Sequence, residues 1–323
     1  MANHSSTSSI LCASFNQDLS YFAVGTRDGF RIFETNSGKL CYERAVGAFV
    51  IVEMLFSSSL IAIVGAGDQP SLSPRRLSLF NTASGAASKE LNFLTSILAV
   101  RMNRERLVVI LQDKAYVYEM RSLSIVDIID TVPNNKGLCA FSPCLDACYL
   151  ALPASTTKGS ALLYNVMNRH LHCEQSYSFR RGTYPSTIFS LSFGPSKELP
   201  DILAASSSSG SIHLFTLGFA SHPRSMSSSG FLGSIIPGAV SGVLDPAYHH
   251  VLHDAVPAGV KSYVVIRKVE NLTNSSSSEL LACRAILSVI TYNGFFKEYN
   301  ISINARNELS WALGREFNLL TVT

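Results

Sequence analysis

Short apolar segments alternate with turn residues along the chain and recur in a similar order. In the first copy, residues 14–16 end in a Phe-polar pair, residues 22–25 are apolar and small, and residues 29–33 run from a turn glycine to an aromatic residue. Alternating apolar and polar positions with β-branched and aromatic residues are typical of strands. The pattern therefore predicts three short strands joined by turns in each copy.

The same pattern is found six times. The other five copies contain these predicted strands: 54–56, 60–64 and 77–80; 100–103, 107–111 and 116–118; 140–142, 149–152 and 159–164; 192–194, 202–205 and 210–215; 285–291 and 294–299. Most copies begin about 40 to 50 residues after the last, the period of a four-stranded propeller blade. No stretch has the i, i+3, i+4, i+7 pattern of a confident helix. The sequence thus predicts an all-β propeller, with residues 1–323 as a single domain.

The composition and net charge of the chain limit the kinds of partner that it can bind. Apolar residues make up 47% of the chain and charged residues 15%, which is enough to bury a large core. A net charge of +3 is too small for a surface that binds nucleic acid throughout, so an anionic partner must meet a local basic patch. Residues 49–64 are interrupted by Glu53 and three serines, and the N-terminus lacks the features of a secretory signal. We predict a cytoplasmic protein that does not span a membrane.

Motifs for enzymatic chemistry are absent from the sequence. The seven cysteines include no C-x-x-C pair, and the eight histidines include no H-E-x-x-H pair. His249, His250 and His253 cluster without a neighbouring carboxylate except Asp254, and Gly65-Ala66-Gly67 lacks the residues of a phosphate-binding loop. We therefore predict no catalytic residue, no metal and no cofactor, and we interpret the protein as a non-enzyme.

Two adjacent arginines at Arg180 and Arg181 are the strongest candidate for binding chemistry. On an extended segment their side chains point to opposite sides, so the pair can serve two neighbouring pockets. Each guanidinium offers planar donors suited to phosphate oxygens, and Gly182 allows a head group to approach the backbone. By residue chemistry alone, such a pair is more often part of a surface ion-pair network than of a binding site.

Several segments resemble the PROPPIN family of WD-repeat-related β-propellers that bind phosphoinositides. Phe179-Arg180-Arg181-Gly182 is similar to the family hallmark, and residues 74–77, 96–107 and 137–151 are similar to family segments in the family's order. The resemblance extends from about residue 11 to residue 320. It implies a seven-bladed propeller that binds phosphatidylinositol 3-phosphate and phosphatidylinositol 3,5-bisphosphate on preautophagosomal, endosomal or vacuolar membranes and recruits partners in autophagosome formation.

The resemblance also assigns site residues. For phosphoinositide binding it implies the following set: Arg180, Arg181, Gly182, Thr183, Ser206, Ser208, Ser211 and His213. Residues 218–247 form a long segment rich in serine and glycine, and in the family this position holds a loop that inserts into membranes. Its apolar residues here are Phe231, Leu232, Ile235 and Ile236. Packing of this loop against the propeller rim is the alternative. A weaker resemblance implies that residues 70–77 contact autophagy-related protein 2, and a plain loop between two strands of the second copy explains this segment equally well.

One departure from the family pattern changes the expectation. In the family a complete blade precedes the arginine tetrapeptide, whereas only residues 165–178 lie between the preceding strand and Phe179 here. The chain is expected to lack about one blade and the pocket on the Arg180 side. We expect one head-group site and weaker attachment. The alternative is a protein-only propeller scaffold that has lost lipid binding.

Overall fold

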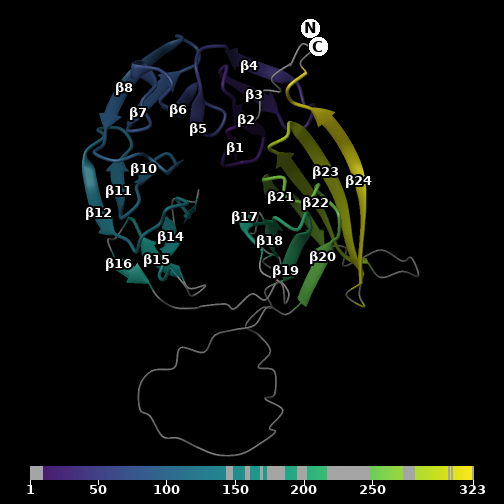
Figure 1. Ribbon diagram of the computed structural model, residues 1–323. Helices are drawn as coiled ribbons and strands as arrows, with labels where there is room; N and C mark the ends of the chain where they lie inside the picture. Colours follow the sequence, from purple (N-terminus) through teal and green to yellow (C-terminus); the bar gives the residue numbers. More distant parts are fainter. Residues whose placement is uncertain are drawn as a thin grey trace, which may run out of the picture. The chain divides into compact units, whose positions relative to one another are not determined.

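The computed structural model describes residues 10–142, 148–156, 161–167, 170–172, 186–194, 202–216, 248–271, 281–304, 306 and 308–321. Within these ranges the chain forms six four-stranded antiparallel sheets, and in each sheet the strands pair in sequence order (Figure 1). A short 3-10 helix, η1, covers Pro70–Leu72. This architecture is an all-β propeller with six blades, as the six copies in the sequence predict.

The first three sheets contain β1 to β12. Their bounds are: β1 Cys12–Phe15, β2 Tyr21–Gly25, β3 Phe30–Glu34 and β4 Leu40–Arg44; β5 Phe49–Met54, β6 Leu60–Gly65, β7 Arg76–Asn81 and β8 Ala86–Asn92; β9 Ala99–Met102, β10 Arg106–Ile110, β11 Lys114–Glu119 and β12 Ile125–Asp130. The last three sheets contain β13 to β24. Their bounds are: β13 Ala140–Phe141, β14 Tyr149–Pro153, β15 Ala161–Asn165 and β16 His170–His172; β17 Ile188–Phe193, β18 Ile202–Ser207, β19 Ile212–Thr216 and β20 Tyr248–Leu252; β21 Ser262–Asn271, β22 Leu281–Thr291, β23 Phe295–Asn304 and β24 Leu309–Asn318.

The described chain divides into two compact units. Unit 1 holds the first four sheets together with residues 290–297 and 315–323, and unit 2 holds residues 174–289 and 298–314. In unit 1, apolar side chains fill the space between successive sheets. Leu107 and Val109 of β10, for example, pack with Leu77 and Leu79 of β7. In unit 2, β18 and β19 pack on β21, β22 and β23 in the same way. The core therefore lies between sheets, as expected for blades that each bury both faces.

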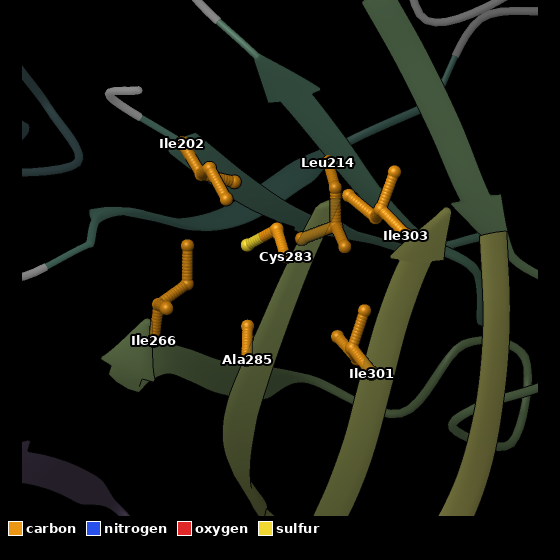
Figure 2. Close-up of a pocket in the computed structure, with 7 residues that line it drawn as sticks. All are labelled: Ile202, Leu214, Ile266, Cys283, Ala285, Ile301 and Ile303. Carbon is orange, nitrogen blue, oxygen red and sulfur yellow. The ribbon is translucent and has the colours of Figure 1, made fainter. Parts of the chain in front are cut away.

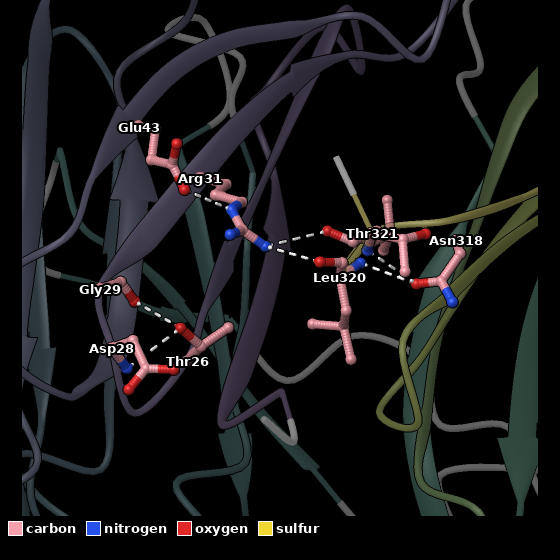
Figure 3. A network of polar contacts seen from close by, with 9 residues as sticks. Thr26, Asp28, Gly29, Arg31, Glu43, Asn318, Leu320 and Thr321 are labelled. Atoms are coloured by element: carbon pink, nitrogen blue, oxygen red, sulfur yellow. Dashed lines mark hydrogen bonds and ion pairs between the residues drawn. The ribbon is translucent and has the colours of Figure 1, made fainter. Parts of the chain in front are cut away.

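In unit 1 the first sheet is joined to the end of the last. The ring of Phe22 stacks on that of Phe296 at 5.1 Å between centroids, and Phe296 stacks on Phe317 at 4.7 Å. Arg31 forms an ion pair with Glu43 at 2.7 Å and donates to the carbonyl oxygen of Leu319 (Figure 3). Within unit 1, these contacts hold residues 290–297 and 315–321 against the first blade.

In the ranges that the structure describes, no helix is long and apolar enough to cross a bilayer.

Candidate functional site

The described part of the predicted phosphoinositide site lies on the fifth sheet (β17–β20), around the turn that joins β18 to β19. Gly210 in this turn has a φ of +83°, which favours glycine, and a Cβ there would lie 2.4 Å from the carbonyl oxygen of Val256. The amide of Val256 donates to the Gly210 carbonyl at 3.0 Å, and that of Gly259 donates to Ser208 at 2.9 Å. The segment after β20 therefore holds the turn in place.

Ser206 lies inside the molecule. Its residue is 1% exposed, and its Oγ donates to the carbonyl oxygen of Ser262 on β21 at 3.0 Å. The hydroxyl of Ser190 lies 2.8 Å from Ser206 Oγ and accepts the amide of Val264 at 2.9 Å. Ser190 on β17 and Ser206 on β18 thus join the fifth sheet to β21, the first strand of the sixth sheet. Ser206, predicted as a head-group ligand, is engaged in this structural contact.

Ser208 and Ser211 lie at the surface end of the same turn and are half-buried. Ser208 Oγ lies 2.9 Å from Ser186 Oγ and accepts the amide of Thr187 at 3.0 Å. The amide of Ser211 lies 3.5 Å from Ser209 Oγ. The turn thus presents a row of hydroxyl groups beside β17, which can donate hydrogen bonds to phosphate oxygens.

His213 lies on the face of the sheet opposite to that of Ser206. Ser206 pairs with Ile212, and Ala205 pairs with His213, so successive positions of β19 alternate between the two faces. The structure therefore places His213 on one face and Ser206 on the other, and Ser211 lies in the turn two positions before His213. His213 is 4% exposed, and its Nδ1 lies 2.9 Å from Nε2 of His249 on β20.

His249 is a polar residue of this face that the sequence interpretation did not include in the site. Its ring stacks on that of Phe215 at 4.5 Å, with an angle of 9° between the planes, and the residue is exposed. Burial, and then the neighbouring His250, lower the pKa of His249 below its usual value. The sequence did contain a signal for His249. Alternation along a strand places the adjacent histidines of Tyr248-His249-His250 on opposite faces, so each face of the sheet receives one of them.

The remaining predicted site residues fall outside the described residues. This holds for Arg180, Arg181, Gly182 and Thr183, and for Phe231, Leu232, Ile235 and Ile236. The strands that flank the latter group are described: Thr216, the last residue of β19, pairs with Tyr248, the first residue of β20. The segment 217–247 therefore leaves and re-enters the sheet at one pair of residues.

Each unit has a hollow that bears on the site. In unit 2 an apolar cavity of about 10 Å³ lies between the fifth and sixth sheets, and Figure 2 shows Leu214, Cys283 and Ile301 beside it. It has no polar lining and is too small to hold a ligand. In unit 1 a polar cleft of about 390 Å³ is lined by residues from four connections: Arg75, Leu94, Thr95, Ser96, Leu98, Gln112 and Asn135. This cleft includes the first arginine of the Arg75-Arg76 pair.

Comparison with known proteins shows the family to which the chain belongs. A family model described as PROPPIN matches residues 9–175. Autophagy-related protein 18b of Arabidopsis thaliana is 56% identical, and the alignment covers 100% of this chain and 100% of that protein. The chain belongs to the PROPPIN family. Autophagy-related protein 18 of Dictyostelium discoideum is also similar, with 30% identity over 96% of this chain and 94% of that protein.

Solved structures agree with the fold. A chain from the complex of KlAtg21 with the coiled-coil of AgAtg16 has a TM-score of 0.64 at 18% identity, over 96% of this PROPPIN and 99% of that chain. The alignment with the Arabidopsis relative extends over 364 residues, 41 more than the 323 of this chain. The first sheet begins at Cys12 and the second at Phe49, 37 residues later. The difference from the relative is thus about as long as one blade.

Proposed function

We propose that this PROPPIN is a non-enzymatic phosphoinositide effector that acts in autophagosome formation. It binds phosphatidylinositol 3-phosphate or phosphatidylinositol 3,5-bisphosphate on preautophagosomal, endosomal or vacuolar membranes and recruits partner proteins there. The observation that carries the proposal is the full-length similarity, at 56% identity, to a relative named for autophagy. In this proposal residues 1–323 act as a single propeller domain.

The head-group site combines the arginine tetrapeptide with the hydroxyl turn of the fifth sheet. Arg181 and Thr183 supply charge and a hydroxyl group, and Ser208, Ser211 and His213 supply further donors. Charge-assisted hydrogen bonds from a guanidinium are well suited to the phosphate oxygens. Ser206 contributes to this site by holding β18 against β21, since its hydroxyl is already bonded to Ser262.

The apolar segment between β19 and β20 provides the second contact with the membrane. Phe231, Leu232, Ile235 and Ile236 insert into the interfacial region, where full burial of a large side chain is worth roughly 1.5 to 3 kcal/mol. The paired residues Thr216 and Tyr248 fix the base of this loop on the same sheet as the hydroxyl turn. Head group and loop then act together at a high effective concentration.

A partner surface is proposed on unit 1. The cleft beside Arg75 offers one guanidinium together with hydroxyl and amide groups, including those of Thr95 and Gln112. Such a lining suits an acidic segment of a partner. Autophagy-related protein 2 is the candidate that the family resemblance suggests for this surface.

Liposome flotation tests the proposed function. Wild type is expected to float with vesicles that contain phosphatidylinositol 3-phosphate and to stay behind with vesicles of phosphatidylcholine alone. The double variant Arg180→Thr/Arg181→Thr is expected to lose most of this flotation, because it removes the charged donors. A control variant, Arg121→Thr/Lys136→Thr, removes the same charge from exposed positions of unit 1 and is expected to float like wild type. Equal flotation of the Arg180/Arg181 variant and wild type rejects the proposed site.

A protein-only scaffold is the second candidate function. Two observations favour it. The alignment with the Arabidopsis relative is 41 residues longer than this chain, and the hydroxyl of Ser206 already donates to the carbonyl oxygen of Ser262. This candidate predicts that wild type fails to float with any phosphoinositide while a pulldown still retains autophagy-related protein 2. Charge reversal at Arg75 is then expected to abolish the pulldown.

A further inference from the structure

The contact between His213 and His249 joins two rings of the fifth sheet. Nδ1 of His213 and Nε2 of His249 lie 2.9 Å apart, which is hydrogen-bond distance, and the ring centroids lie 5.1 Å apart. His213 is buried, whereas His249 is exposed and rests on Phe215. The pair therefore connects the interior of the sheet with solvent.

Such a pair can take up a single proton without losing its internal bond. In two neutral imidazoles, one ring donates its N–H to the bare nitrogen of the other, and one outer nitrogen of the pair stays unprotonated. A proton added at that outer nitrogen gives the pair one positive charge. An anion near the pair favours this charged form. Binding of an anion is then coupled to uptake of a proton.

The position of the pair places it within the proposed head-group site. His213 follows Ser211, in the hydroxyl turn, by two positions of the chain. His249 pairs with Phe215, one position from the Thr216–Tyr248 pair at the base of the loop. His249 thus lies between the hydroxyl turn and the base of the segment proposed to enter the membrane.

We propose that His249 is a further phosphate-binding residue, and that the His213–His249 pair takes up a proton when a phosphomonoester binds. This inference rests on the proposed function, because it assigns a new residue and a proton to the same site. It predicts that affinity for the phosphomonoester rises as the pH falls through the neutral range.

Other ionisable groups around the pair are few in the described part of this sheet. On the same face, β17 and β18 contribute Leu191, Leu203 and Ala205, none of which titrates. Tyr248 and His250 belong to the opposite face of β20, and His253 and Asp254 follow in the exposed turn. Arg180 and Arg181 are the charged groups that the proposal itself adds. Burial and then His250 lower the pKa of His249, which favours its neutral ring in the unbound protein.

The sign of the pH dependence follows from linkage. A bound phosphate dianion raises the pKa of the pair, so the complex binds more protons than the free protein between the two pKa values. Affinity in that interval rises by up to about tenfold for each unit of falling pH. The phosphate group itself gains a proton near pH 6, so the measurements are made between pH 8 and pH 6.5.

Titrations with vesicles containing phosphatidylinositol 3-phosphate test the inference, and parallel titrations use soluble inositol 1,3-bisphosphate. Wild type is expected to bind both ligands more tightly at pH 6.5 than at pH 8. His249→Gln is expected to bind several-fold more weakly at pH 6.5 and to lose most of the pH dependence. His249→Arg, with a permanent charge, is expected to keep strong binding at both pH values. His253→Gln, at an exposed neighbouring position, serves as the control and is expected to behave like wild type.

The outcomes separate this inference from the proposed function. If wild type binds but His249→Gln keeps its affinity and pH dependence, the inference is wrong and the proposed function stands. If wild type binds only the soluble phosphate, with pH-dependent shifts of the His213 and His249 ring resonances, the inference stands and the membrane function fails. If neither ligand binds or shifts these resonances, both are wrong. Circular dichroism melts confirm that each variant is folded.

Discussion

The junction between the first two sheets and the junction between the last two use the same device with different surroundings. At the first, Ser14 on β1 donates to the carbonyl oxygen of Val52 on β5 at 2.5 Å. At the last, Ser206 on β18 donates to that of Ser262 on β21 at 3.0 Å. In both cases a buried serine joins one blade to the first strand of the next blade, from β1 in the first case and from β18 in the second. The comparison indicates that a serine on an inner strand is first a structural residue.

The two junctions differ in what lies beside the serine. Next to Val52 in the chain, Glu53 is 6% exposed, and its carboxylate lies 3.4 Å from Nη1 of Arg101 on β9, in the third sheet. Next to Ser206 lies a row of serines that ends in a turn at the surface. The residue after Val52 therefore places a buried carboxyl group between the second and third sheets, whereas the serines after Ser206 carry neutral hydrogen-bond donors to the surface.

The largest expected effect concerns Glu53. Burial raises its pKa to about 7, and Arg101 only partly opposes this shift. A raised carboxyl pKa means that the folded state binds the proton more tightly than the unfolded state. The free energy of unfolding therefore falls as pH rises from about 4.5 to about 7, by about 3 kcal/mol in all.

Glu53→Gln should remove this dependence and stabilise the protein at pH 8. About 1 kcal/mol of the effect falls between pH 6 and pH 8, where denaturant unfolding can measure it. Glu90→Gln, on an exposed strand of the same unit, is the control and should unfold like wild type at each pH. A Glu53→Gln protein whose stability still falls like that of wild type would contradict the account of this junction.

Next in size is the loss of the serine contact itself. Ser206→Ala removes the hydrogen bond from the serine hydroxyl to the carbonyl oxygen of Ser262. This buried oxygen then lacks a donor, so the free energy of unfolding falls by about 1 to 3 kcal/mol. Ser14→Ala should lose a similar amount at the first junction. Chemical unfolding followed by the fluorescence of Trp311, the single tryptophan, reports on unit 2.

Flotation of Ser206→Ala and Ser14→Ala distinguishes a structural serine from a ligand. If Ser206 is structural, Ser206→Ala should float with phosphatidylinositol 3-phosphate about as well as Ser14→Ala at a temperature where both are folded. Loss of flotation by a Ser206→Ala protein that unfolds like wild type would instead make Ser206 a ligand.

The smallest expected effect is at the surface turn. Ser208→Ala loses contacts with Ser186 and Thr187 but leaves a half-buried site open to water, so stability should fall by only about 0.5 to 1 kcal/mol. Lipid affinity should fall a few-fold, because a donor to the head group is lost. Ser122→Ala, on a turn of unit 1, should change neither. An unchanged affinity of Ser208→Ala would remove this residue from the site.

The inner strands of each blade could be predicted from the sequence, whereas the outer strands could not. Inner strands such as β10 are apolar on both faces because they pack between two neighbouring sheets, and their β-branched residues identify them. The outer strand β8 has the sequence Ala-Ala-Ser-Lys-Glu-Leu-Asn and is exposed at most positions. Its residues carry no apolar alternation, so only pairing with β7 makes it a strand.

The candidate site was harder to predict than the fold. The predicted ligands from Ser206 to His213 are close in sequence, but they belong to two strands joined by a turn. The register between these strands pairs Ser206 with Ile212, so Ser206 and His213 lie on opposite faces of the sheet. His249 lies 36 residues after His213 and joins it only because β19 and β20 pair across a long connection. Contacts of this kind depend on strand register, which the local sequence pattern does not specify.

The decisive measurement is the number of head groups that each chain binds. The account predicts a six-bladed PROPPIN with one phosphoinositide site, built on the fifth sheet. Isothermal titration with water-soluble dibutanoyl phosphatidylinositol 3-phosphate should give a stoichiometry close to one ligand per chain, and Arg181→Thr should abolish the binding. A stoichiometry close to two would contradict the account, as would the absence of binding by a folded wild-type protein.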